Sequence, residues 1–294
     1  MQRVAITGIG IVSSIGNNKN EVLDSLRQGR SGVELVPERR ELGFTSCLAG
    51  TIKNFVPPVM PKENQRQMGR GGFLAVQAAR EAIEDAGLDS GLIAHERTGT
   101  IVANSGNMQD IYQLIYRKVI DRKKLTAMAL ARTMASTISA NLSVLFGMRG
   151  QCMTLANACS SGATAIGQGA QAIRLGIQDR MLVGGAQEGS WEYDILFDAL
   201  RVFSRREDDP TGASRPFDKS RDGLVPSAGA GFVILENYDQ AVDRCARIYA
   251  ELIGYATNSD GAKMTTPSGE GSIRCMQLVL ADALVNADEI DYIN

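Results

Sequence analysis

The stretch Gln151–Ile173, QCMTLANACSSGATAIGQGAQAI, contains no charged residue. It is too rich in Ser, Thr, Asn, Gln and Gly to be a membrane span. A strand over Gln151–Ala158 that leads into a helix over Ser160–Leu175 accounts for the pattern when both are buried inside the protein. We therefore expect a central strand followed by a core helix.

Small and apolar residues alternate along the predicted helix in a way that suits close packing. Four apolar residues keep helical spacing: Ala163, Ile166, Ala170 and Ile173. Three glycines should let neighbouring elements approach closely: Gly162, Gly167 and Gly169. The helix is therefore expected to lie against a sheet.

Strand and helix patterns alternate along the rest of the chain. The predicted strands are Arg3–Val12, Thr100–Ala103, Met181–Gly184, Phe232–Leu235 and Ile248–Tyr255. The predicted helices are Asn20–Gln28, stopped by Gly29, an amphipathic Phe73–Ala86, and Ser136–Phe146. Arg30–Gln67 shows no clear period and is expected to be irregular. This alternation predicts an α/β fold with a largely parallel sheet.

Composition limits the classes of function. The 294 residues include 44% hydrophobic and 22% charged residues, with a formal net charge of −2, so nothing favours nucleic acid or an anionic membrane as partner. No run approaches a membrane-spanning length. Five cysteines are scattered without metal-ligand spacing, which fits a reducing compartment and predicts a cytoplasmic protein.

The chain holds a single histidine, His95, in the polar stretch Ala94–Arg97. Its neighbours Glu96 and Arg97 indicate a structural role at the surface. Metal hydrolysis, Cys-His proteolysis and Ser-His-Asp chemistry each require a histidine near their other groups. Nothing in the sequence supports any of them, and we expect neither a metal site nor a cofactor.

Cys159 lies between the end of the predicted strand and the start of the predicted helix. The helix N-terminus places partial positive charge beside the sulfur and favours the thiolate. Unsatisfied N–H groups of a first turn can stabilise an oxyanion, and the N–H of Cys159 is a natural donor. Small neighbours, Ala158 and Ser160–Gly162, leave room for a substrate. From spacing alone, a nucleophile and a small buried residue are both compatible with this position.

The pair Gly8-x-Gly10 follows the start of the first predicted strand. A dinucleotide-binding fingerprint requires a third glycine where Ser13 stands, and a helix that begins at once. We interpret the two glycines as a tight turn.

Several motifs resemble those of the β-ketoacyl synthases. Asn157–Gly162 (NACSSG) resembles their nucleophile motif, and Val4–Ser13 (VAITGIGIVS) resembles their opening strand. Further matches are Ser214–Asp218 (SRPFD) with Arg221–Gly223 (RDG), Ser259–Gly261 (SDG) and Pro267–Gly271 (PSGEG). The synthase I branch of bacterial fatty-acid synthesis is the nearest match, on Ser13–Asn18 (SSIGNN), Trp191-Glu192 and Gly269–Met276 (GEGSIRCM).

The resemblance implies a thiolase fold, two similar halves stacked in a five-layer α-β-α-β-α sandwich, usually as a homodimer. Residues 1–247 then form the first half, which carries the nucleophile, and residues 248–294 begin the second. The first family histidine normally follows a strand like Ile290–Asn294 by two residues. We accordingly expect an incomplete second half, with the catalytic histidines beyond the last residue.

The resemblance also implies a two-stage reaction. Cys159 takes an acyl chain from acyl carrier protein, and the carbanion from decarboxylated malonyl-carrier protein then attacks the thioester. Positions expected near the acyl pocket are Asn107, Met108, Met134, Leu196 and Leu224. At position 224 the family commonly has Phe. Ordinary core packing explains these positions equally well.

Acyl carrier proteins of this pathway are strongly acidic, so docking requires a local basic patch. The candidates are Lys62 and Arg66, together with Lys123 and Lys124 in the run that begins at Arg122. A solvated charged loop is the other interpretation of this run.

Two other functions compete with fatty-acid elongation. A ketosynthase of a polyketide or aryl-polyene pathway uses the same chemistry on another substrate. The second is a non-catalytic partner that pairs with an active synthase. Cys159 argues against it, because such partners typically lack the nucleophile, whereas the missing catalytic histidines argue for it.

Overall fold

Six strands form the central sheet of the protein, in the order β5-β4-β6-β7-β1-β8. The computed structural model describes residues 1–294. The strands of this sheet are β1 (Val4–Ser13), β4 (Thr98–Ala103), β5 (Cys152–Leu155), β6 (Arg180–Gln187), β7 (Gly229–Asn237) and β8 (Ala250–Glu251). A separate two-stranded sheet pairs β2 (Val33–Leu35) with β3 (Leu48–Gly50).

The helices surround this sheet. They are α1 (Lys19–Arg27), α2 (Glu38–Glu41), α3 (Lys62–Gln67), α4 (Arg70–Asp85), α5 (Ser90–Ile93), α6 (Met108–Val119), α7 (Ala129–Thr133), α8 (Thr137–Phe146), α9 (Ser161–Arg174), α10 (Trp191–Ala199), α11 (Tyr238–Asp243) and α12 (Glu270–Ala283). Short 3-10 turns occupy Pro210–Gly212 and Ala287–Glu289. The segment expected to be irregular, 30–67, thus holds four short elements.

The sheet is mixed, which corrects the expectation of a largely parallel one. β4 pairs in parallel with both β5 and β6, but β7 runs antiparallel to β6 and to β1, and β8 antiparallel to β1. The connection from β6 to β7, residues 188–228, contains α10 but does not carry the chain back to the end of the sheet where β6 begins, so β7 lies beside β6 in the opposite direction.

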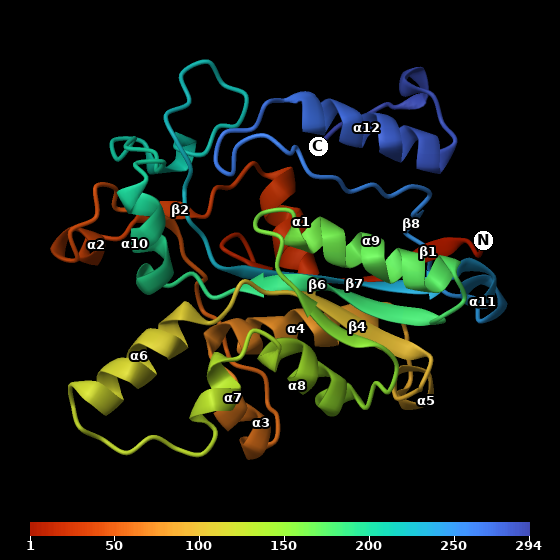
Figure 1. The fold of residues 1–294 in the computed structure, drawn as a ribbon, viewed down its shortest axis with the longest axis horizontal. Helices are drawn as coiled ribbons and strands as arrows, with labels where there is room; N and C mark the ends of the chain where they lie inside the picture. Colours follow the sequence, from red (N-terminus) through yellow and green to blue (C-terminus); the bar gives the residue numbers. More distant parts are fainter.

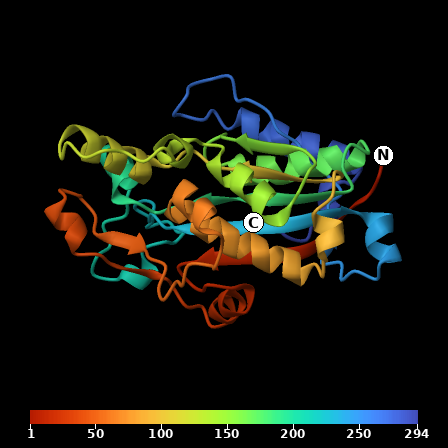
Figure 2. The same cartoon turned by 90° about the horizontal axis from the view of Figure 1, so that it is seen from below.

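Helices cover both faces of the sheet (Figure 1). α4 and α8 lie against one face and build the larger core, which includes Leu74, Ile138 and Phe232. α9 covers the other face over a smaller core around Ile101 and Ile173. α12 lies farther out on the α9 side, where Arg174 pairs with Asp282 at 2.8 Å. Figure 2 shows the same sheet between its helices from below.

β5 is an edge strand, not the central strand that its charge-free sequence predicts. Only β4 pairs with it, and Cys152 and Met153 are exposed. The absence of charge therefore does not reflect burial within the chain. The following helix, α9, packs on the sheet as predicted. Its buried residues include Ala170 and Ile173 of the predicted stripe and also Ala165, whereas Ala163 of the predicted stripe is exposed.

Two of the three glycines of α9 permit close contacts, as expected. A Cβ at Gly167 would lie 2.0 Å from the ring of Tyr255, and one at Gly169 would lie 2.5 Å from Val183. Gly162 has open space beside it, so close packing does not explain that residue.

Gly8 and Gly10 lie inside β1, where we expected a tight turn. A Cβ at Gly8 would lie 2.1 Å from the carbonyl oxygen of Ala82, and one at Gly10 would lie 1.9 Å from that of Ala78. Neither residue has a left-handed backbone. The glycines are needed because β1 and α4 touch backbone to backbone, not because the chain turns.

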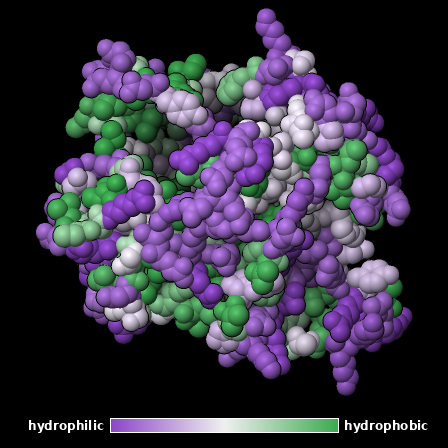
Figure 3. Space-filling view, turned by 180° about the vertical axis from the view of Figure 1, so that it is seen from behind, coloured by the Kyte–Doolittle hydropathy of each residue, from purple (hydrophilic) through white to green (hydrophobic).

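The face opposite that of Figure 1 is mostly hydrophilic (Figure 3). Hydrophobic residues gather beside a hollow at the upper left of this view. The half-turn brings α12, which lies at the upper right in Figure 1, to the same corner. α12 exposes Ile273, Met276 and Leu278. No helix is long and apolar enough to cross a membrane.

The β1–α4 contact leads to a stability prediction. Gly10→Ala should lower the free energy of unfolding by about 2 to 3 kcal/mol, because the new methyl group meets a backbone carbonyl that cannot move alone. Gly231→Ala on β7 is the matched control, since a Cβ there meets nothing within 4 Å. Urea unfolding followed by circular dichroism measures both variants. Equal midpoints for the two variants would contradict the packing argument.

Candidate functional site

Cys159 occupies a sharp turn between β5 and α9. Its neighbour Ala158 has a left-handed backbone, with φ of +48°, which a residue with a side chain adopts only under constraint. Cys159 is exposed, so the interpretation of a small buried residue does not hold. The turn resembles the strained strand-to-helix elbow that presents a nucleophile in serine hydrolases.

Hydroxyl groups hold this turn in place. Ser161 Oγ accepts from the N–H of Asn157 at 2.6 Å and donates to the carbonyl of Ala158 at 2.6 Å. Ser160 Oγ donates to the carbonyl of Asn157 at 2.8 Å. Because Ser160 and Ser161 also donate their N–H groups to these two carbonyls, neither amide is free to bind an oxyanion. The N–H of Cys159 stays our prediction for that donor.

A cavity of about 340 Å³ adjoins the turn at the carboxyl ends of two parallel strands. This is the edge of an α/β sheet where ligands usually bind. The cavity is lined by Ala103–Ser105 after β4, by Ala158, Ser161 and Gly162, by Gly185–Gln187 at the end of β6 and by Ser227–Gly231 at the start of β7. No charged side chain lines it. The small residues leave space at the turn that carries Cys159.

A second, larger cavity of about 610 Å³ shares Gln187 and Ser227 with the first. Its apolar walls include Phe197, Phe203 and Leu224. Leu224 is therefore a cavity residue, as its place beside the RDG motif suggests. The sequence analysis did not predict Gln187 as a site residue. Its position at the end of a strand, after Gly184 and Gly185, could have indicated it.

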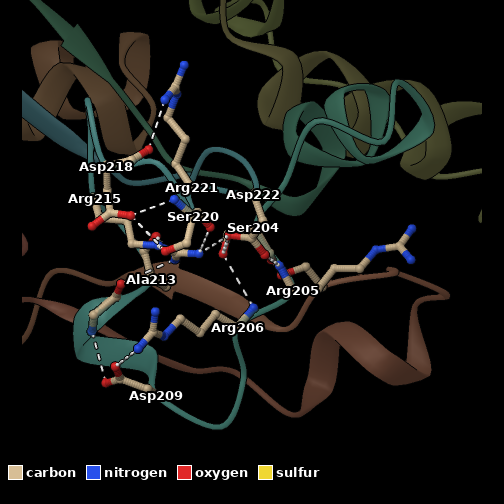
Figure 4. Close-up of polar contacts among 12 residues, drawn as sticks. Ser204, Arg205, Arg206, Asp209, Ala213, Arg215, Asp218, Ser220, Arg221 and Asp222 are labelled. Atoms are coloured by element: carbon tan, nitrogen blue, oxygen red, sulfur yellow. Dashed lines mark hydrogen bonds and ion pairs between the residues drawn. The ribbon is translucent and has the colours of Figure 1, made fainter.

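The loop that carries the SRPFD and RDG motifs is a polar network beside this cavity (Figure 4). Asp222 accepts from Ser204 Oγ at 2.7 Å and from the N–H of Arg205 at 2.8 Å, and pairs with Arg215 at 3.2 Å. The hydrogen bond from Ser204 is the main cause that lowers the pKa of Asp222. In Figure 4, the Arg205 guanidinium points away from the network. These bonds hold the loop that forms one wall of the cavity.

The SDG and PSGEG motifs also meet in space. Asp260 accepts from the hydroxyl of Ser268 at 2.6 Å, from the N–H of Ser268 at 2.9 Å and from the N–H of Gly271 at 2.9 Å. The hydroxyl of Ser268 is the largest cause that lowers the pKa of Asp260. The interaction ties the start of α12 to the loop before it.

The other candidates for the acyl pocket do not surround one cavity. Asn107 is buried and donates its side-chain amide to the carbonyls of Arg132 and Met134, at 3.0 and 3.3 Å. Met108 begins α6 and lines a shallow apolar hollow on that helix. Met134 and Leu196 are exposed, the latter on α10.

The basic candidates lie on two neighbouring segments. Lys62 and Arg66 are exposed on α3, and Lys123 and Lys124 are exposed in the loop between α6 and α7. Lys123 has a weak ion pair with Asp121 at 3.5 Å. α3 contacts α7, and both segments lie at the lower side of Figure 1.

His95 lies just before β4, at the end of that strand opposite the cavity. Its Nδ1 accepts from the N–H of Arg97 at 3.1 Å, and its carbonyl accepts from Thr98 and Arg149. These contacts give His95 a structural role in the loop. The chain has no group of three or more His, Cys, Asp or Glu residues that could hold a metal ion.

The structure thus places an exposed cysteine, Cys159, beside the left-handed Ala158 in a layered α/β architecture. The "Beta-ketoacyl synthase, N-terminal domain" family matches residues 1–241, and the "Beta-ketoacyl synthase, C-terminal domain" family matches residues 249–294. The chain therefore belongs to the β-ketoacyl synthase family.

Individual relatives agree with this assignment. The 3-oxoacyl-[acyl-carrier-protein] synthase 1 of Haemophilus influenzae is 41% identical over all of this chain and 73% of its own length. A β-ketoacyl synthase from Burkholderia phymatum has a solved structure that matches 99% of this chain and 73% of that one, with a TM-score of 0.93 and 35% identity. The fold is thus thiolase-like.

A second similar structure is a complex. AntDE:AntF, a type II PKS acyl-carrier protein with its ketosynthase bound to the hexaketide, matches all of this chain and 72% of that one. The TM-score is 0.88 and the identity 28%.

The hydroxyl bonds at the turn lead to a prediction. Ser161→Ala should slow modification of Cys159 by an acyl thioester at least about threefold, because the lost bonds, worth about 1 kcal/mol each, no longer hold Ala158 left-handed. Ser160→Ala, which removes a single exposed bond, should cause a smaller loss. Mass spectrometry of timed reactions measures both rates. Equal rates in the two variants would show that Ser161 does not hold the turn.

Proposed function

We propose that this protein is a β-ketoacyl-acyl-carrier-protein synthase of fatty-acid elongation, with Cys159 as the residue that accepts the acyl chain. The observation that carries the proposal is the exposed thiol on the left-handed turn beside a cavity of small residues. The 41% identity to a 3-oxoacyl-[acyl-carrier-protein] synthase 1 over the whole chain supports the choice of pathway.

The first chemical step transfers the acyl group. The sulfur of Cys159 attacks the thioester carbonyl of the acyl carrier, a new carbon–sulfur bond forms, and the carrier's own thiol leaves with the proton. The N–H of Cys159 stabilises the oxyanion in the tetrahedral intermediate. In the second step, malonyl-carrier protein loses CO2, and its carbanion displaces Cys159 from the acyl group to form the β-ketoacyl product.

The larger cavity suits the carrier's flexible arm. It lies beside the smaller cavity and shares Gln187 and Ser227 with it, so an arm threaded through it ends near the nucleophile. Its walls are largely apolar, and Leu224 is among them. The acyl chain itself is then received in the region of Asn107, Met108 and Met134.

Acyl carrier protein is the proposed partner. The exposed cations Lys62 and Arg66 on α3, with Lys123 and Lys124 in the next loop, supply the positive surface that an acidic carrier requires. The ketosynthase in AntDE:AntF is seen with an acyl-carrier protein, which supports a partner of this class.

A homodimer is the proposed assembly. β5 presents an unpaired edge with exposed Cys152 and Met153, and unpaired edges are ready templates for pairing with another chain. α6 adds an apolar surface of Ile115, Val119 and Ile120, each more than half exposed. A second copy can cover both.

Two organisational features go with the proposal. The first half of the fold, residues 1–247, carries Cys159, and residues 248–294 belong to the second half. A cytoplasmic location suits five cysteines that are all free thiols.

Two alternatives have weaker support. A polyketide or aryl-polyene ketosynthase shares the chemistry, but the type II PKS complex is only 28% identical to this chain. A non-catalytic partner has no use for the accessible thiol of Cys159.

The nucleophile leads to a direct test. Cys159→Ala should abolish covalent labelling by an acyl thioester analogue, because Cys159 lies at the turn between β5 and α9 that adjoins the smaller cavity, whereas Cys245 is also exposed and left-handed but does not line that cavity. Cys152→Ala and Cys245→Ala are matched controls, since both residues are also exposed free thiols. Peptide mapping by mass spectrometry locates the label. Labelling that persists in Cys159→Ala at the wild-type rate would refute the assignment.

The basic surface leads to a second test. Lys123→Glu combined with Lys124→Glu should slow acyl transfer from acyl carrier protein by about tenfold at low salt and flatten its salt dependence. Arg27→Glu combined with Lys263→Glu reverses two other exposed cations and controls for total charge. Stopped-flow mixing with fluorescently labelled carrier protein gives the association rate. If both double variants slow it equally, no local docking patch exists.

A further inference from the structure

One buried carboxylic acid stands beside the proposed site without a part in its chemistry. Glu188 directly follows Gln187, which lines both cavities, and its residue is 2% exposed. It lies in the loop between β6 and α10. One of its oxygens, Oε2, is buried and has no hydrogen-bond partner.

The other oxygen of Glu188 holds the start of α6. Oε1 accepts from the N–H of Gln109, in the first turn of α6, at 2.9 Å, and from Ser190 Oγ at 3.1 Å. First-turn N–H groups have no partner within their own helix. The helix itself lacks a side-chain cap at Asn107, so Glu188 supplies the cap from another element.

The surroundings of Glu188 are acidic. α6 contributes Asp110, and α10 contributes Glu192, both buried and each with one carboxylate oxygen that has no partner. Two ion pairs complete the cluster. Arg39 on α2 pairs with Asp194 on α10, and Arg132 on α7 pairs with Asp110. On α4, Gly71 lies beside Glu188, and the adjacent Arg70 is exposed.

The charges of this cluster do not balance. Four carboxylates face two guanidinium groups, which leaves an excess of two negative charges in a buried region. Uncompensated buried charge is unfavourable, and such groups respond by taking up protons. Burial is the main cause that raises the pKa of Glu188, and the negative charges of Asp110 and Glu192 raise it further. Burial also raises the pKa of Asp194.

We propose that Glu188 is a positioning residue whose proton locks the first turn of α6 onto the β6–α10 loop. Protonation on Oε2, the oxygen without a partner, removes one negative charge from the cluster while Oε1 keeps its bond to Gln109. When the proton leaves, like charges on α6 and on the loop repel, and the turn is released.

The lock acts on the wall of the nucleophile's cavity. Ser105, which precedes α6, donates to Gln187 at 3.3 Å, and both residues line that cavity. Release of the α6 turn therefore loosens a wall next to Cys159. This consequence rests on the proposed function, whereas the lock itself does not.

The sign of the pH dependence follows from linkage. A carboxyl whose pKa is higher in the folded protein than its ordinary value of 4.5 stabilises the folded arrangement at low pH. That contribution is lost as the pH rises through the raised pKa. The first turn of α6 should therefore open more often as the pH rises from 4.5 through the raised pKa of Glu188.

Hydrogen exchange tests the lock without relying on catalysis. In the wild-type chain, protection factors of the Gln109–Tyr112 amides, corrected for intrinsic rates, should fall as the pH is raised above 4.5, by up to about tenfold per pH unit for one coupled proton. Glu188→Gln, which keeps an acceptor for Gln109 and adds a donor, should retain high protection with no such fall. Glu84→Gln, an exposed carboxylate on α4, should behave as wild type.

The outcomes separate a lock from a merely structural residue. Glu188→Ala should lose protection at all pH values, and Glu192→Gln should weaken the pH dependence because it removes one repelling neighbour. If Glu188→Gln does not fold, Glu192→Gln still tests the cluster. Protection that is independent of pH in the wild-type chain, or that falls equally in Glu188→Gln, overturns the proposal. If hydrogen exchange confirms the lock but Cys159 is labelled at the same rate in the wild type and in Glu188→Ala, only the proposed link to function is contradicted.

Discussion

The close contact between β1 and α4 is the constraint on which most of the structure depends. At Gly8 and Gly10 the strand lies so near the helix that even one added methyl group would overlap a carbonyl oxygen. β1 in turn pairs with β7 along nearly its whole length and with β8 at Ala5 and Ile6. The glycines therefore set the distance between the sheet and the helix beneath it, and the alanines of α4 fill the remaining space.

Polar contacts reinforce this packing at the same two turns of α4. Glu81 accepts from the N–H of Ile11, and Asp85 accepts from the N–H of Ile9, each at 2.9 Å. β8 leaves these two N–H groups without a strand partner because it pairs with β1 over only two residues. Burial pushes the pKa of Asp85 upward, but bonds from Lys19 and Ile9 outweigh it and leave the pKa lowered. The carboxylates of the helix thus complete the edge of the sheet.

The sequence predicted those features that depend on local patterns. The amphipathic stripe of α4, the left-handed Gly29 after α1 and the strand-to-helix turn at Cys159 all lie close to where their patterns indicated. Position within the sheet was not predictable, because the same uncharged stretch can be covered by this chain or by another. β5 has the composition of a central strand and lies at the edge. The role of Gly8 and Gly10 was missed for a similar reason, since the partner that requires them is about seventy residues away.

The edge position of β5 connects the chemistry to the assembly. The strand, the left-handed turn and the proposed nucleophile follow one another within eight residues, from Cys152 to Cys159. A second copy that pairs along β5 would therefore fix the strand on which the turn is built, within a few residues of the Cys159 sulfur. Exposed Met153 would become buried in that arrangement, which explains why an edge strand can dispense with the charged residues that usually protect such edges from pairing. In the proposed homodimer the uncharged composition of the stretch serves pairing between chains, and the geometry of the turn at Cys159 depends on the assembly as well as on the fold.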